Sequence, residues 1–124
     1  MDIELMINIS LFTNILSMCK GLHWATSSYA KHMALDQAYD DFNEVFDKYV
    51  EVAIGIYGRD SLYTTSIINE LCSDESIYLK VSDEFLKCNK ELEKINGNHS
   101  SLISLYDEIR AIQNQLLYRL TFND

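Results

Sequence analysis

Five acidic side chains follow one another through the middle of the chain. They are Asp36, Asp40, Glu44, Asp47 and Glu51. Their steps of three or four residues place them on one face of an α-helix, where residues at these spacings are neighbours. Adjacent carboxylates in such a row repel one another by about 0.2–0.5 kcal/mol per pair, unless a cation or a basic partner lies against them. The row therefore indicates either an acidic face in contact with water or a site for a cation.

Two of the three histidines lie just before this row. His23 and His32 flank the polar stretch Ala25–Tyr29, and His32 lies near the start of the segment that carries the acids. Imidazole and carboxylate ligands together suit iron(II) and related metals, so a mixed site is chemically reasonable. The alternative for each histidine alone is a partly buried or capping residue. We apply that interpretation to His99 and assign it no role.

The composition favours one helical domain that spans residues 1–124. Hydrophobic residues make up 48% of the chain, which is enough for a core. The chain has no proline and only four glycines, so the residues that usually interrupt helices are rare in it. The acidic start Met1–Glu4 lacks the positive charge of a signal peptide, and no apolar stretch is long enough to cross a bilayer. We therefore expect a soluble cytoplasmic protein without membrane contact.

Charge and cysteine usage argue against two further classes of protein. The formal net charge of −9 repels phosphate backbones, so direct DNA binding is not expected, whereas a basic protein partner is compatible with it. Cys19, Cys72 and Cys88 are widely spaced and odd in number, and no two of them have the spacing of a zinc knuckle. We expect all three to be reduced residues of the core.

Two long helices are predicted in the first half of the chain. Apolar residues recur at helical spacing from Glu4 to about Trp24, and again from about Lys31 to Tyr57, where Gly58 is placed to end the helix. The predicted core residues of the first helix are Leu5, Ile9, Phe12, Leu16 and Cys19. Those of the second helix are Leu35, Ala38, Phe42, Val45, Tyr49, Val52 and Ile56.

The second half contains two more predicted helices, after a stretch of mixed character at residues 59–73. Three apolar residues permit a short helix within that stretch, namely Ile67, Ile68 and Leu71. The third helix follows the N-cap pair Ser73–Asp74 and stops at Asn96–Gly97, and either Ser100 or Ser101 can cap the fourth. The predicted core residues are Val81, Phe85, Cys88, Leu92 and Ile95 in the third helix, and Leu102, Leu105, Ile109, Ile112, Leu116 and Leu120 in the fourth.

Four amphipathic helices with one longer connection, between the second and the third, predict an antiparallel four-helix bundle of the ferritin-like type. In such bundles, metal sites are built from side chains on facing helices.

The residues around the two histidines resemble the iron site of Dps proteins, the mini-ferritins that protect DNA in starved bacteria. The similar stretches are Leu22-His23-Trp24, then His32-Met33-Ala34-Leu35-Asp36, then Asp47 and Glu51 one helical turn apart. In that family a His-Trp pair, a second histidine, an aspartate one turn later and a final Asp and Glu recur in this order. From His32 onward the spacings are those of the family. The run from Leu11 to Ile56 is similar in character, and the segment Tyr106-Asp107-Glu108-Ile109 resembles the family's last helix.

The resemblance implies a subunit that pairs across a twofold axis and binds iron between subunits. It divides the metal ligands into His23 and His32 from one chain, and Asp36, Asp47 and Glu51 from its partner. Trp24 would lie next to the iron as an electron donor, or alternatively would be a hydrophobic anchor at the helix end. Iron(II) would be oxidised there by peroxide or oxygen, and the mineral would be kept inside a closed shell.

Two functions are compatible with the sequence. The first is an iron-oxidising protein that forms at least a homodimer, and the joint presence of the histidines and the later carboxylates favours it. The second is a non-enzymatic ferritin-like interaction protein, similar to compact phage-encoded chains, which has a degenerate metal site and meets a basic partner with its acidic face. The turn between His23 and His32 is shorter than in the Dps family, which favours the second. The lysine-rich tail of DNA-coating members has no counterpart in the sequence, so DNA coating is not expected.

Overall fold

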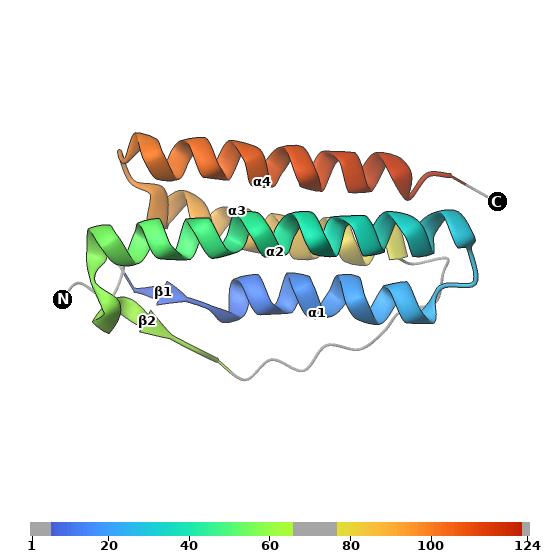
Figure 1. The fold of residues 1–124 in the computed structure, drawn as a ribbon, viewed down its shortest axis with the longest axis horizontal. Coiled ribbons are helices and arrows are strands. Elements are labelled where there is room, and N and C mark those ends of the chain that lie inside the picture. The colour runs from blue at the N-terminus through green and yellow to red at the C-terminus, as the bar shows by residue number, and fades with distance from the viewer. Residues whose placement is uncertain (1–5, 66–76, 123–124) are drawn as a thin grey trace.

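Four helices lie along a common direction in the computed structural model, which describes residues 6–65 and 77–122 (Figure 1). They are α1 (Ser10–Ala25), α2 (Tyr29–Tyr57), α3 (Ile77–Asn96) and α4 (Ser100–Arg119). Because the described residues are mostly helical, the predicted all-α class with four helices is confirmed. Within the described part of the chain, no helix combines the length and the apolar character needed to cross a membrane.

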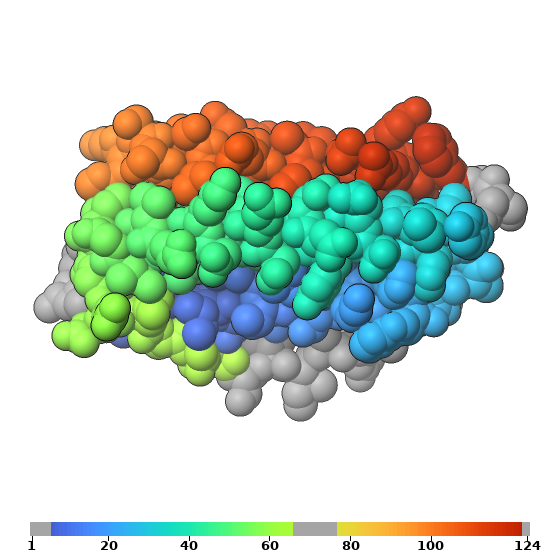
Figure 2. Space-filling view, viewed as in Figure 1, coloured from blue at the N-terminus to red at the C-terminus, as the bar shows by residue number. Residues whose placement is uncertain are grey.

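The helices surround one hydrophobic core. α2 packs against α1 and α4, and α3 packs against the same two helices. Figures 1 and 2 show α2 across the front of the molecule, between α4 and α1. The predicted core is confirmed where the following residues are buried: Leu35, Ala38, Phe42, Val45 and Tyr49 in α2, all five predicted core residues of α3, Leu102, Ile109 and Leu116 in α4, and Leu120 directly after α4. Leu105 and Ile112 are half-buried.

The predicted stripe of α2 leaves the core at its carboxyl end. Val52 is only half-buried and Ile56 is 36% exposed, whereas Ala53 is fully buried. The predicted residues repeat strictly every seven positions, and a straight helix drifts by about 20° per heptad relative to that repeat. The buried face therefore moves to Ala53 by the last turns of the helix.

The first helix begins later than predicted. Ile7–Asn8 form a short strand, β1, which pairs in parallel with β2 (Leu62–Tyr63). The side chain of Asn8 accepts a hydrogen bond from the Ser10 amide at 3.0 Å, and the Ser10 hydroxyl donates to the Thr65 carbonyl at 2.9 Å. These polar contacts hold residues 7–10 against residues 62–65 and start the helix at Ser10.

The buried face of α1 is also rotated from the predicted one. Phe12 and Cys19 are buried as predicted, whereas Ile9 and Leu16 are only half-buried. Their places in the core are taken by Ile15, Met18 and Leu22. The predicted core residue Leu5 lies outside the described residues.

The predicted end of α2 is confirmed at Gly58. This residue has a φ of +90°, a conformation that favours glycine, and a 3₁₀ turn follows at η2 (Arg59–Ser61). The sequence did not predict the strand that comes next. The predicted short helix around Ile67, Ile68 and Leu71 lies outside the described residues, as does the predicted cap Ser73–Asp74.

The connection between α3 and α4 is a tight turn, as predicted. Gly97 has a φ of +51° directly after the last residue of α3. The prediction that Ser100 or Ser101 caps α4 was wrong, because His99 is the N-cap residue and makes no side-chain capping hydrogen bond. Its ring instead contacts Tyr57 edge-on, with the ring centroids 5.7 Å apart.

Candidate metal centre

The last turn of α1 and the first turn of α2 bring two histidines into direct contact. The rings of His23 and His32 are stacked, with their centroids 3.7 Å apart and an angle of 20° between their planes. Nδ1 of each ring lies 2.7 Å from the backbone oxygen of the other histidine. Two reciprocal hydrogen bonds therefore hold the pair together.

These hydrogen bonds determine which ring nitrogen carries the proton. A carbonyl oxygen can only accept, so Nδ1 of each imidazole must be the donor. In a neutral ring, Nε2 then has no proton and keeps its lone pair. Metal-bound histidines commonly have this arrangement, in which one nitrogen binds the metal and the other donates to a carbonyl or a carboxylate. In their neutral forms, His23 and His32 therefore each keep an Nε2 lone pair that is available to a cation.

The turn between the helices is what positions the histidines. The Ser28 side chain caps α2 by accepting a hydrogen bond from the Lys31 amide at 3.2 Å, and Thr26 Oγ1 accepts one from the Ser28 amide at 3.1 Å. Small polar side chains stabilise caps and turns in this way. Although the turn is shorter than in the family that the sequence resembles, it brings His32 next to His23.

Asp36 lies one helical turn after His32 and joins the pair. Its Oδ1 atom is 4.0 Å from Nε2 of His23 and 3.8 Å from Nζ of Lys20. The resemblance assigned Asp36 to the partner chain, but the structure brings this carboxylate to a histidine of its own chain. We refer to these side chains as the His23–His32–Asp36 cluster.

Asp47 and Glu51 do not reach this cluster. Both are exposed on α2, about 16 Å and about 22 Å farther along the helix axis than Asp36 at a rise of ~1.5 Å per residue. Within residues 6–65 and 77–122, no group of three or more His, Cys, Asp or Glu side chains could hold a metal ion. A centre that uses both the histidines and the later carboxylates would therefore require a second chain.

Trp24 lies at the edge of the cluster, on the surface. Its side chain is 72% exposed, so one chain alone does not bury it as a hydrophobic anchor. Nζ of Lys20 lies 5.9 Å from the centroid of the indole ring and 4.8 Å from that of Tyr39. The three side chains line a hollow of about 450 Å³ between α1 and α2. Lys20 therefore connects Asp36 to both aromatic rings.

The acidic row on α2 is a solvated face in the single chain. Asp40, Glu44, Asp47 and Glu51 are all exposed. Among the described residues, no lysine, arginine or histidine forms an ion pair with any of them. Part of the row borders a surface hollow together with Lys48.

The comparison with known families places the chain in one of them. A family of unknown function, DUF5856, matches residues 23–120, which is well over half of the chain. The chain belongs to DUF5856. The matched region contains all six candidate site residues, from His23 to Glu51. No curated protein and no solved structure matches the chain.

Sequence reasoning missed two residues near the cluster in this DUF5856 protein. Lys20 precedes His23 by one helical turn, and Tyr39 follows Asp36 by one turn. Residues at this spacing share a helix face, so both could have been found by extending each helix face by one turn.

The described thiols of this DUF5856 protein are not part of the candidate centre. Cys19 and Cys88 are free and buried, and burial raises the pKa of each thiol to about 12. Both therefore stay protonated at neutral pH, whereas a metal ligand must be a thiolate. Their prediction as reduced core residues is confirmed, and Cys72 lies outside the described residues.

Proposed function

We propose that this protein is a Dps-like iron-binding protein with a ferritin-like, antiparallel bundle. In this proposal, it is a cytoplasmic homo-oligomer that oxidises iron(II) with peroxide or oxygen at a site between two chains, and it can store the oxidised iron. Each iron(II) ion gives up one electron to the oxidant, and the reduced oxygen atoms take up protons to form water. Iron is thus the substrate of the reaction.

The observation that carries this proposal is the reciprocal pairing of His23 and His32. Each ring donates a hydrogen bond from Nδ1 to the carbonyl oxygen of the other residue, and in the neutral form of each ring this leaves Nε2 unprotonated. Asp36 adds a carboxylate 4.0 Å from one of these nitrogens. Imidazole and carboxylate together form a ligand set that iron(II) accepts.

The later carboxylates would complete the site from a second chain. Asp47 and Glu51 are exposed and lie one helical turn apart, so their side chains can converge on one cation. Their distance along α2 from the cluster of their own chain, about 16 Å for the nearer one, argues for an intersubunit arrangement. A twofold contact would form two equivalent sites, because each chain would supply both halves.

Trp24 would lie beside the bound iron in this arrangement. The second chain could cover the indole that is exposed in one chain alone. In that position, next to the iron, the indole could donate an electron to the oxidant. The free, buried thiols of Cys19 and Cys88 are compatible with the reducing conditions of the cytoplasm.

The proposal is tested by iron(II) binding and oxidation in the full chain. Iron(II) should raise the melting temperature by mass action, and peroxide should oxidise the bound iron faster than it oxidises iron in buffer. Asp47→Ala with Glu51→Ala should abolish both effects. The matched control is Asp40→Ala with Glu44→Ala, which removes two acids from the same helix at the same spacing and should leave both effects intact. A wild-type chain that shows neither effect rules out the ferroxidase function.

One observation favours a second candidate, a non-enzymatic interaction protein with a degenerate metal site. Asp36 already has a cationic partner, because the ammonium group of Lys20 lies 3.8 Å from its carboxylate. If this pair persists when iron(II) is added, Asp36 is not available as a ligand. In that case the bundle would serve as a scaffold whose acidic surface meets other proteins.

A further inference from the structure

A groove follows the seam between α2 and α4. It lies on the α4 side of α2, whereas the His23–His32–Asp36 cluster lies on the α1 side, and the seam faces the viewer in Figures 1 and 2. Two hollows of about 320 Å³ and about 590 Å³ form the groove, and both are bordered by Asp41. It is therefore separate from the candidate metal centre.

Small side chains leave the surface of this seam hollow. Ala30 and Ala34 on α2 and Ala111 on α4 line the two hollows, which larger side chains at these positions would fill. From Ala30 to Lys48 the groove extends about 27 Å along α2, at a rise of ~1.5 Å per residue. This length matches a helix of about 18 residues.

The groove has an apolar lining, part of which is exposed to water. Val45 and Ile112 form the floor of one hollow, and Met33 and Phe122 line the other. Met33 is 47% exposed and Phe122 is 45% exposed, although both are large apolar side chains. An apolar groove between two helices is the kind of surface in which an amphipathic helix can lay its apolar face.

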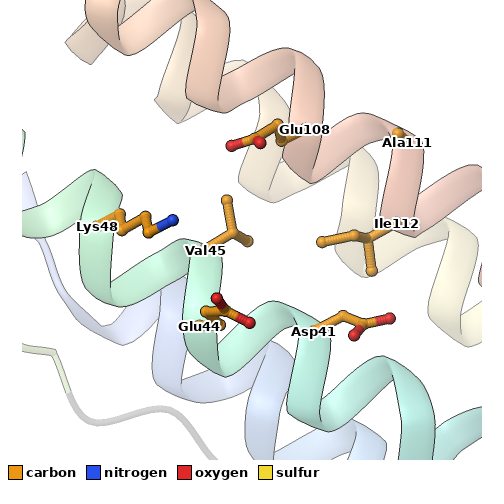
Figure 3. Close-up of a pocket in the computed structure, with 7 residues that line it drawn as sticks. All are labelled: Asp41, Glu44, Val45, Lys48, Glu108, Ala111 and Ile112. Carbon is orange, nitrogen blue, oxygen red and sulfur yellow. The ribbon is translucent and has the colours of Figure 1, made fainter.

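Carboxylates border the middle of the groove. Figure 3 shows Glu108 on α4 and Glu44 on α2 on the two sides of Val45, with Asp41 one turn closer to the start of α2. None of these three carboxylates has an ion pair with a described residue. Lys48 is the one basic residue in the lining of this hollow, and Arg119 is the one in the lining of the other. The middle of the groove thus has a negative charge that a partner could neutralise.

The charges that line the groove distinguish between two kinds of binding partner, a second copy of this chain and a basic helix of another protein. A second copy of the chain that docked through the same groove would place one lining that carries Asp41, Glu44 and Glu108 against another of the same kind. Like charges placed together in an interface are unfavourable. A helix with one apolar face flanked by lysine or arginine instead matches both the floor and the carboxylates.

We propose that the α2–α4 groove binds a basic amphipathic helix of another protein. The apolar face of that helix contacts Val45, Ile112, Met33 and Phe122, and its basic residues pair with Asp41, Glu44 and Glu108. This binding surface goes beyond the proposed iron chemistry and does not depend on it.

The experiment uses a fluorescent peptide of about 18 residues, built from leucine and lysine so that the leucines form one helical face. A second peptide of the same composition has its order scrambled so that no apolar face forms. Anisotropy titrations with the full chain, without metal and at about 150 mM salt, limit the contribution of long-range charge. We expect the facial peptide to bind at least about tenfold more tightly than the scrambled one.

Two groove variants and two matched controls locate the binding. Ala111→Trp fills the groove and should weaken binding of the facial peptide about tenfold, and Glu44→Gln with Glu108→Gln should weaken it about fivefold. Leu86→Trp on α3 also adds an indole, and the pair Asp83→Asn with Asp107→Asn also removes two carboxylates. These positions are exposed and outside the lining, and the substitutions should change binding less than about twofold.

Three results would overturn the proposal. The first is equal binding of the two peptides, which would mean that surface charge alone attracts them. The second is equal binding by the groove variants and their controls. The third is self-association of the wild-type chain that Ala111→Trp abolishes, which would make a second copy the occupant.

Discussion

The imidazole rings of His23 and His32 stack at a centroid distance of 3.7 Å while each donates a hydrogen bond to the carbonyl oxygen of the other residue. The pair therefore connects the end of α1 to the start of α2 without any metal. The same two side chains have a structural role and a proposed ligand role, and a substitution of either one changes both. For this reason the acidic residues, rather than the histidines, give the cleaner test of metal binding.

The first prediction concerns the stability of the histidine pair. His32→Ala removes one of the two reciprocal hydrogen bonds and leaves the His23 carbonyl without that donor. We expect the free energy of unfolding to fall by about 1–2 kcal/mol in the presence of a chelator, measured by urea denaturation. The control is His99→Ala, which removes an exposed ring without a side-chain capping hydrogen bond and should cost less than about 0.5 kcal/mol. Equal losses in the two variants would show that the pair does not stabilise the fold.

The second prediction concerns the division of the site between chains. A variant with His23→Ala and His32→Ala keeps the carboxylates of the site but lacks its imidazoles. A variant with Asp47→Ala and Glu51→Ala keeps the imidazoles but lacks these two carboxylates. Each should be inactive alone. If the two are unfolded, mixed in equal amounts and refolded, random pairing leaves one intact site in each mixed dimer, or about a quarter of all sites.

The measurement is the rate of peroxide-driven iron oxidation, compared between the refolded mixture and each variant alone. The control is the same mixing of either variant with itself, which should recover nothing. A mixture as inactive as its components, although mixed dimers are detected by mass, would contradict the intersubunit site.

The third prediction concerns Lys20. Its ammonium group lies 3.8 Å from the Asp36 carboxylate and competes with any other cation for that oxygen. Lys20→Met keeps much of the length of the side chain and removes the charge, so we expect iron(II) to bind several-fold more tightly, as measured by the titration of the thermal shift. Lys87→Met is the control, because Lys87 pairs with Glu84 on α3, far along the chain from the cluster. Unchanged affinity in Lys20→Met would mean that Asp36 does not bind the ion.

The fourth prediction concerns nucleic acid. A chain with a net charge of −9 can neutralise few phosphates, so little counterion release is available to drive binding. We expect no gel shift of plain duplex DNA at about 150 mM salt. A gel shift that is present at about 150 mM salt would contradict this prediction.

The parts of the fold that the sequence predicted well depend on local signals. The α3 stripe from Val81 to Ile95 is short enough for a seven-residue repeat to remain on one face, and all of its predicted core residues are buried. The longer stripe of α2 failed at Ile56, because the helix drifts away from that repeat over several turns. Glycine signals at Gly58 and Gly97 correctly marked two helix ends.

The parts that the sequence missed depend on contacts between distant residues. The pairing of Ile7–Asn8 with Leu62–Tyr63 joins segments more than fifty residues apart, and neither strand has more than two residues to form a pattern. At the candidate centre, the spacing placed His32 and Asp36 on one face of a helix. It could not reveal that the short turn stacks His32 on His23, since that requires the geometry of both helices.

The last prediction compares two glycines three residues apart in the chain. Gly55 lies inside α2 and has nothing within 4 Å of the position that a Cβ atom would take. Gly55→Ala should therefore raise the free energy of unfolding by about 0.5–1 kcal/mol, because alanine loses less backbone entropy in a helix.

Gly58 has equally open surroundings but a φ of +90°. An added methyl group would meet no neighbour, so the whole cost of Gly58→Ala is conformational, and we expect a loss of about 1–2 kcal/mol. Thermal and urea unfolding of the two variants, measured with the wild-type chain under the same conditions, should thus give changes of opposite sign. If both substitutions stabilise the protein, the backbone at Gly58 does not have a positive φ in solution, and the chain must leave α2 toward η2 by a different path.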